Sequence, residues 1–188
     1  MTGTATSLLG WYDSPVMPAM RVGEFLTMVQ ERTMALLPEE VRAGSTSRTS
    51  SSWLWVHYHD PRVHFEVWLA RKTGRIEIGL HFEGPREFSY RWAEQMAPHM
   101  PEIQARLGPQ VELEEWTASW ARVHRTVPYD PLSEPLADEV ARRFAETITV
   151  LHPIVEKERH NVPPELAAMR ERRPVTSGRF THRRKRGV

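Results

Sequence analysis

Residues 52–83 alternate between apolar and polar side chains with a period of two. Three segments, 52–59, 63–70 and 75–83, are rich in Trp, Val, Ile, Phe and Tyr, the residue types favoured in strands. Asp60-Pro61 and Lys72-Thr73-Gly74 supply turn residues between them. The pattern predicts a three-stranded antiparallel meander with one face almost wholly aliphatic or aromatic, and this face is the expected core.

Three other segments repeat apolar positions at helical spacing. The first covers 20–37 and is expected to end before Pro38, because the residue preceding a proline disfavours helical conformation. The second begins at Pro85, and Pro98 and Pro101 must kink or split it. The third begins after Ser133, a suitable N-terminal cap, and its apolar stripe reaches Val155.

Two further strands are predicted over 111–117 and 120–127, and the Ser/Thr-rich stretch 43–52 is expected to be a flexible polar loop. The element order is then helix, three-strand meander, helix, hairpin, helix. We therefore predict an α+β fold, a two-layer sandwich of a mostly antiparallel five-stranded sheet with helices on one face. The expected organisation is an N-terminal arm (1–19), a single α+β domain (20–156) and a basic C-terminal tail (157–188), without internal repeats.

The second face of the predicted meander is unusual, because tryptophans and histidines replace the usual Lys, Thr and Ser. Its candidate ligand-binding residues are Trp53, Trp55, His57, His64, Glu66, Trp68 and His81. An aromatic patch of this kind usually marks a contact. A ligand, a protein partner, the N-terminal arm and a second copy of this chain, forming a homo-oligomer, are all candidates for that contact.

The turns also predict the register of the meander. Tight turns at 60–61 and 72–73 place His57 opposite His64, Trp53 opposite Trp68, and His64 opposite His81. Three imidazoles from adjacent strands could bind a divalent metal, with Glu66 or Glu83 nearby, and such a metal could activate water. A register shift of one residue would scatter this row, and the spacing matches no local metal motif.

The net charge of +1 conceals two unlike parts of the chain. Residues 1–156 hold 15 basic and 21 acidic side chains, whereas residues 157–188 hold 10 basic and 3 acidic side chains. Arginine clusters with interleaved aromatic residues can bind nucleic-acid phosphates and bases. The candidate nucleic-acid-binding residues are Arg179, Arg183, Arg184, Lys185 and Arg186. An acidic protein partner, or a tail that folds back on the acidic body, would use the same charge.

The residue types and motifs that the sequence lacks exclude several classes of site and reaction. The chain has no cysteine, which excludes disulfides, thiol catalysis and cysteine-ligated metals and fits a cytoplasmic protein. It has no apolar run that predicts a membrane span and no secretory signal pattern. Glycine-rich phosphate loops and the serine-hydrolase pentapeptide are also missing.

The layout from about residue 65 to 156 resembles an uncharacterised bacterial domain family whose members are sometimes attached to nuclease-like modules. The resemblance rests on RIEIGLHFEGP, on PEIQARLGPQVELEEW, on SWARVHRTV and on the long helix that follows. It implies a nucleic-acid or defence-associated role and carries over no catalytic residues.

Together these features predict a small, non-enzymatic binding module. Its basic tail would contact nucleic acid or an acidic partner, and its His/Trp face would bind a ligand or protein. The alternatives are a metal-dependent enzyme using His57, His64 and His81, with a divalent metal as cofactor, and a structural or oligomer-forming subunit.

Overall fold

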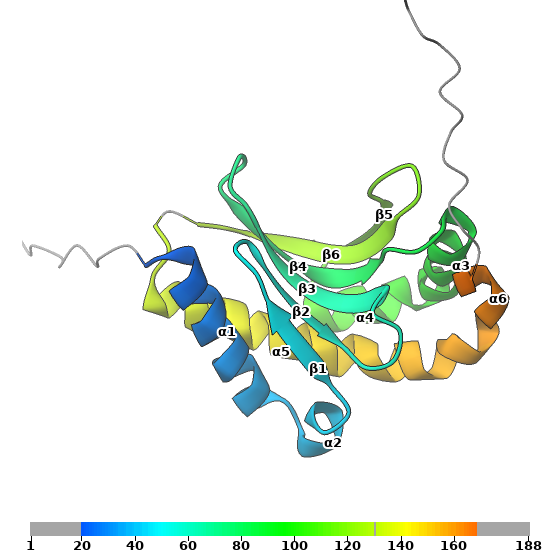
Figure 1. Cartoon of the computed structure of the whole chain (residues 1–188), viewed down its shortest axis with the longest axis horizontal. Helices are drawn as coiled ribbons and strands as arrows, with labels where there is room; N and C mark the ends of the chain where they lie inside the picture. The colour runs from blue at the N-terminus through cyan, green and yellow to red at the C-terminus, as the bar shows by residue number, and fades with distance from the viewer. Residues whose placement is uncertain (1–19, 130, 169–188) are drawn as a thin grey trace, which may run out of the picture.

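The computed structural model describes residues 20–129 and 131–168, and the predicted α+β architecture is confirmed (Figure 1). A single six-stranded antiparallel sheet carries helices against one of its faces. The strands are β1 (Thr46–Thr49), β2 (Trp53–His57), β3 (Val63–Ala70), β4 (Arg75–Phe82), β5 (Glu112–Glu115) and β6 (Ala121–Pro128). The helices are α1 (Val22–Leu36), α2 (Glu39–Arg42), α3 (Arg86–Met96), α4 (Met100–Leu107), α5 (Glu134–Glu158) and α6 (Pro164–Ala168), with 3-10 turns at Ala97–His99 and Arg159–Asn161.

The strand order across the sheet is β1-β2-β3-β4-β6-β5. The register predicted from the turns is confirmed for two pairs, since Trp53 lies opposite Trp68 and His64 opposite His81. The ladder between β2 and β3 ends at the pair Val56–Phe65. The predicted pair His57–His64 would be the next step in this register but is not part of the ladder, and on the other side of β2 His57 lies opposite Thr46 of β1.

The sheet has six strands and not the predicted five, because part of the expected flexible loop at 43–52 is strand β1. Its four residues, Thr-Ser-Arg-Thr, lie antiparallel to β2 at the edge of the sheet. The segment lacks apolar alternation because three of its four side chains are exposed. Ser47 nevertheless accepts a 2.7 Å hydrogen bond from the Gln30 side chain of α1, which ties the edge strand to the helical layer.

The helices cover the aliphatic face of the sheet, as predicted. Ile76, Ile78, Leu80 and Phe82 of β4 are fully buried, and α1 and α5 pack against each other beneath the sheet (Figure 1). Burial of this apolar area is the main source of stability in a domain of this size.

The prolines act on the helices as the sequence indicates. Helix α1 ends at Leu36, just before Pro38, and the helix that starts after Pro85 is split into α3 and α4 by the 3-10 turn at Ala97–His99. Ser133 occupies the N-cap position of α5, but its side chain makes no capping hydrogen bond.

The predicted boundary after residue 156 lies inside α5, which continues to Glu158 and is followed by the second 3-10 turn and α6. The predicted arm (1–19) and the tail beyond residue 168 lie outside the described residues. Within the described part of the chain, no helix has both the length and the hydropathy needed to cross a membrane.

Candidate functional site

The predicted ligand face is the sheet face opposite the helices, and it is largely buried. His64, Glu66 and His81 are at most 5% exposed, whereas Trp53, Trp55, His57 and Trp68 are partly exposed. Strand alternation brings these side chains to one face because successive residues point to opposite sides of the sheet. The face therefore holds buried ionisable groups under a layer of aromatic side chains.

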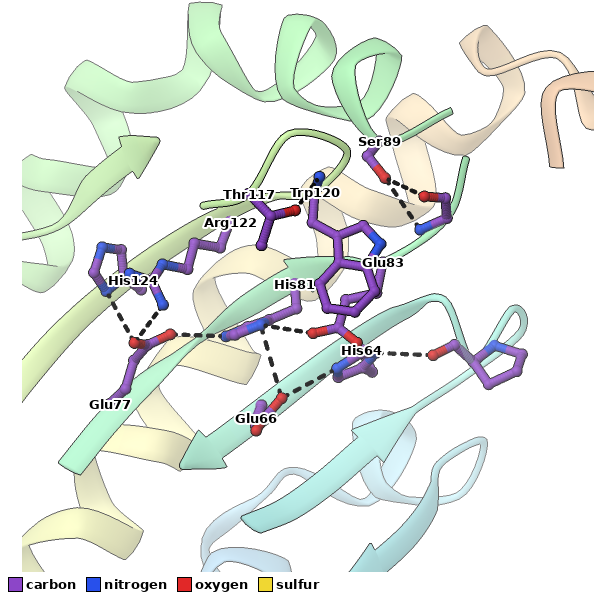
Figure 2. Close-up of polar contacts among 12 residues, drawn as sticks. His64, Glu66, Glu77, His81, Glu83, Ser89, Thr117, Trp120, Arg122 and His124 are labelled. Atoms are coloured by element: carbon purple, nitrogen blue, oxygen red, sulfur yellow. Dashed lines mark hydrogen bonds and ion pairs between the residues drawn. The ribbon is translucent and has the colours of Figure 1, made fainter. Parts of the chain in front are cut away.

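Four side chains from two neighbouring strands converge at the centre of this face. His64 and Glu66 come from β3, His81 comes from β4, and Glu83 directly follows β4. One ligand-type atom from each of these four residues lies within 4.8 Å of the other three. We refer to His64, Glu66, His81 and Glu83 as the His/Glu cluster. Figure 2 shows their contacts.

Each histidine of the His/Glu cluster has one ring nitrogen that faces away from the cluster and contacts an oxygen atom there. His64 Nδ1 lies 2.8 Å from the Pro61 carbonyl oxygen, so this nitrogen donates and carries the hydrogen. His81 Nε2 lies 3.0 Å from Glu77 Oε1. The remaining nitrogens, Nε2 of His64 and Nδ1 of His81, are therefore the ones directed toward Glu66 and Glu83 (Figure 2).

The distances inside the cluster differ from those around it. His64 Nε2 lies 3.3 Å from Glu66 Oε2, and His81 Nδ1 lies 3.4 Å from Glu83 Oε1 and 3.7 Å from Glu66 Oε2. Hydrogen bonds between nitrogen and oxygen are usually about 2.7–3.2 Å long. The outer contacts to Pro61 and Glu77 fall in that range, whereas the three inner distances exceed it.

A second polar network adjoins the His/Glu cluster through Glu77. Arg122 Nη1 donates to Glu77 Oε2 at 2.6 Å, and Arg122 Nε donates to Glu114 Oε1 at 2.8 Å. His124 Nε2 lies 3.0 Å from the same Glu114 oxygen, and His124 Nδ1 lies 3.7 Å from Glu77 Oε2. Glu77 thus lies between the cluster and an arginine on β6.

Three titratable groups of this face, His81, Glu77 and His124, have shifted pKa values. Burial alone would lower the pKa of His81, but its contacts with Glu77, Glu83 and Glu66 outweigh burial and raise the pKa to about 9. Burial tends to raise the pKa of Glu77, and its contacts with His81, Arg122 and His124 reverse this and lower it. Burial lowers the pKa of His124, and Arg122 acts in the same direction.

Aromatic side chains cover the cluster from both sides. Trp55 stacks on His64 with ring centroids 4.3 Å apart, and Trp53 stacks on Trp55 at the same distance. On the other side, the Trp116 ring meets the His81 ring edge-on at 5.3 Å. Trp116 follows β5 and also packs against Trp68 and Trp120, so the β5–β6 connection forms part of the cover.

The structure brings together two of the three histidines predicted as metal ligands. His64 and His81 belong to the His/Glu cluster, whereas His57 is not part of this group of four. Glu66 and Glu83, expected only nearby, supply the other two groups. Strand alternation placed Glu77 on this face but not among the candidate site residues, and nothing in the sequence indicated that Arg122 and Trp116 are neighbours of the site.

One signal in the sequence could have identified the cluster. The tripeptide His-Phe-Glu occurs twice, at 64–66 and 81–83, on adjacent antiparallel strands. With His64 opposite His81, each glutamate lies two residues beyond its histidine on the same face. A repeated His-x-Glu across an antiparallel pair therefore places two imidazoles and two carboxylates together.

The predicted nucleic-acid-binding residues, Arg179, Arg183, Arg184, Lys185 and Arg186, lie outside the described residues. A second group of potential metal ligands, Glu112, Glu114 and His124, lies toward the β5 edge of the sheet. The carboxylate of Glu114 is already paired with Arg122, and the positive charge of Arg122 would repel a metal cation at this position.

Comparisons with models of protein families, with curated proteins and with solved structures found no match to this chain. The resemblance to an uncharacterised bacterial domain family therefore stays a prediction, and the side chains of this face carry the functional argument.

Proposed function

We propose that this chain is a metal-binding protein whose His/Glu cluster holds one divalent transition-metal ion between β3 and β4. The main support is the orientation of His64. Because its Nδ1 hydrogen is donated to the Pro61 carbonyl, the Nε2 of neutral His64 is a hydrogen-bond acceptor, and it faces a Glu66 carboxylate oxygen, another acceptor, at 3.3 Å. Two acceptors at this distance need a proton or a cation between them.

The inner distances favour a metal ion as that cation. In a tetrahedral site with bonds of about 2.1 Å, neighbouring ligand atoms are about 3.4 Å apart. Three of the six distances among the four ligand atoms, 3.3, 3.4 and 3.7 Å, are close to this value, and all six are within 4.8 Å. Hydrogen bonding alone would favour shorter contacts.

Charge and donor type support the same proposal. Glu66 and Glu83 supply two negative charges in a buried place, and a divalent ion that replaces the proton on His81 neutralises both. Two imidazole nitrogens and two carboxylate oxygens suit Zn²⁺, Fe²⁺, Co²⁺ or Mn²⁺ better than the hard ions Mg²⁺ and Ca²⁺.

The same geometry favours a structural role for the metal over a catalytic one. Catalytic zinc sites keep a position open for water or substrate, whereas structural sites use four protein ligands. Here four side chains converge, both histidines are fully buried, and the Trp55 and Trp116 rings pack against them. A metal-dependent enzyme would need this aromatic cover to move.

The test is metal binding by the purified full-length chain and three histidine variants. We expect one Zn²⁺ or Co²⁺ per chain by elemental analysis and calorimetric titration, and loss of tight binding in His64→Ala and His81→Ala. His57→Ala is the matched control, because this histidine was predicted in the same row but is not one of the four residues of the His/Glu cluster. Failure to bind either ion, or equal loss in His57→Ala, would overturn the proposal.

A second function rests on the sequence of the tail alone. The ten basic and three acidic side chains of residues 157–188 support a proposal that the tail binds nucleic acid or an acidic partner. Deleting residues 170–188 should weaken DNA or RNA binding and flatten its dependence on salt, because fewer phosphates are neutralised. Unchanged binding after the deletion would exclude the tail as the contact.

A further inference from the structure

Resting on the proposed metal centre, we infer that Glu77 is a positioning residue that orients His81 toward the metal, and that Arg122 holds Glu77 in place. Neither residue is among the four proposed ligands. Arg122 on β6 contacts Glu77 on β4, and Glu77 in turn contacts His81 on the same strand (Figure 2).

The position of Glu77 in the sheet brings its carboxylate to the His81 ring. It lies four residues before His81 on the same face of β4, is 3% exposed, and has one oxygen 3.0 Å from His81 Nε2. Histidines that bind metals usually direct the other ring nitrogen to a carboxylate or a carbonyl, which fixes the ring and makes the metal-facing nitrogen a stronger donor. His64 has the carbonyl form of this arrangement through its hydrogen bond to Pro61, and His81 has a carboxylate oxygen of Glu77 at ion-pair distance in the equivalent place.

Arg122 fixes the orientation of the Glu77 carboxylate. Its Nη1 binds Glu77 Oε2 at 2.6 Å, which leaves Oε1 directed at His81. The Arg122 guanidinium also lies 4.9 Å from the centre of the Trp116 ring, and that ring contacts His81. Arg122 therefore joins the contact behind His81 to the aromatic cover beside it.

The inference is tested by Co²⁺ titration of the full-length chain, following both affinity and the visible absorption of the bound ion. Glu77→Gln keeps the side-chain shape but removes the charge, and we expect a loss of affinity of about ten- to a hundredfold. The absorption spectrum should stay that of the wild type, because the four ligands are unchanged. Arg122→Met should lower the affinity by a smaller factor, also without a spectral change.

Two comparisons separate a positioning role from other roles. Glu83→Gln alters a proposed ligand, so its spectrum should change. Glu102→Gln removes an exposed carboxylate of α4, on the helical side of the sheet, and should leave both affinity and spectrum unchanged. If Glu77→Gln does not fold, Glu77→Asp, which withdraws the carboxylate by one methylene, should show the same loss of affinity.

The outcomes distinguish this inference from the proposed function. If the wild type does not bind Co²⁺, both fail. If the wild type binds but Glu77→Gln has the same affinity, the metal centre stands and the positioning role of Glu77 is excluded. A changed spectrum in Glu77→Gln would show that Glu77 is itself a ligand, which also overturns the inference.

Discussion

The two faces of strand β4, at the centre of the sheet, are both buried but are stabilised in different ways. On β4, Ile76, Ile78 and Leu80 point toward the helices and are fully buried, while Glu77 and His81 point to the opposite face and are 3% and 0% exposed. The helical face gains stability from apolar area removed from water. The opposite face must pair its charges to offset their loss of hydration.

This contrast explains why the register of the sheet is well determined. A slip of one residue would bring Glu77 and His81 against the helices and place Ile78 and Leu80 among the charged groups of the opposite face. The same contrast predicts which face should make the stability of the protein depend on metal ions. The helical face should respond to changes in side-chain volume, and the His/Glu face should respond to charge and to metal.

The largest expected effect is on the helical face. Phe144 of α5 is fully buried, and Phe144→Ala should lower the free energy of unfolding by about 3–5 kcal/mol, because it removes a large apolar side chain and leaves a cavity. Urea denaturation with and without Zn²⁺ measures this. The loss should be the same in both conditions. If Zn²⁺ restored the lost stability, the helical face would not be independent of the metal, and the proposed difference between the faces would be wrong.

The next effect belongs to the His/Glu face and follows from the proposed metal. A ligand at a hundred times its dissociation constant stabilises the folded state by about 2.7 kcal/mol. Saturating Zn²⁺ should therefore raise the melting temperature of the wild type and of Phe144→Ala alike. In His81→Ala the rise should disappear, and an equal rise there would place the ion elsewhere.

Much of this contrast was predictable from the sequence. The period-two alternation of residues 52–83 identified both faces, and the short turns at 60–61 and 72–73 left little freedom in the register, so Trp53–Trp68 and His64–His81 were paired correctly. Local turn geometry and a strongly apolar face are sufficient to determine such pairs.

What could not be predicted depends on contacts between distant segments or on strands without an apolar face. Strand β1 is polar because it lies at an exposed edge, so its alternation carries no signal. The contact of Arg122 with Glu77 joins residues 45 positions apart. The place of Trp116 over His81 depends on the path of the β5–β6 connection, which no periodicity encodes.

Gly79 offers a sharper test of how tightly the His/Glu face is built. A Cβ at this position would lie 2.7 Å from the Val123 carbonyl oxygen and 2.8 Å from His124 Cβ, so β6 would have to shift. Gly79→Ala should therefore destabilise the protein by about 1–3 kcal/mol. Thermal unfolding of the variant measures the loss.

Gly23→Ala is the matched control for that substitution. Gly23 lies in α1, and a Cβ there would have no heavy atom within 4 Å. Alanine favours the helix over glycine by up to about 1 kcal/mol, so this variant should be as stable as the wild type or slightly more stable. Equal destabilisation of both variants would mean that the close approach at Gly79 is not the cause.

The smallest effect is expected at the β2–β3 turn, where the chain passes from one strand to the next beside the cluster. The Asp60 side chain accepts hydrogen bonds from the Arg62 backbone nitrogen at 3.0 Å and from Arg62 Nε at 2.9 Å. Burial alone would raise the pKa of Asp60, but these hydrogen bonds outweigh it and lower the pKa below its ordinary value. The ionised carboxylate therefore stabilises the folded state.

The sign of the pH dependence follows from the lowered pKa. The stabilisation is complete above the pKa of Asp60 in the unfolded chain, about 3.9, and is lost as the pH falls through the lower value of the folded state. Asp60→Asn keeps an acceptor for the Arg62 backbone but not the charge, so the wild type should be more stable at pH 7 by no more than about 1 kcal/mol. Urea denaturation between pH 7 and pH 3 should show this difference shrinking with acidity. A difference that stays constant would assign the stabilisation to turn geometry instead of charge.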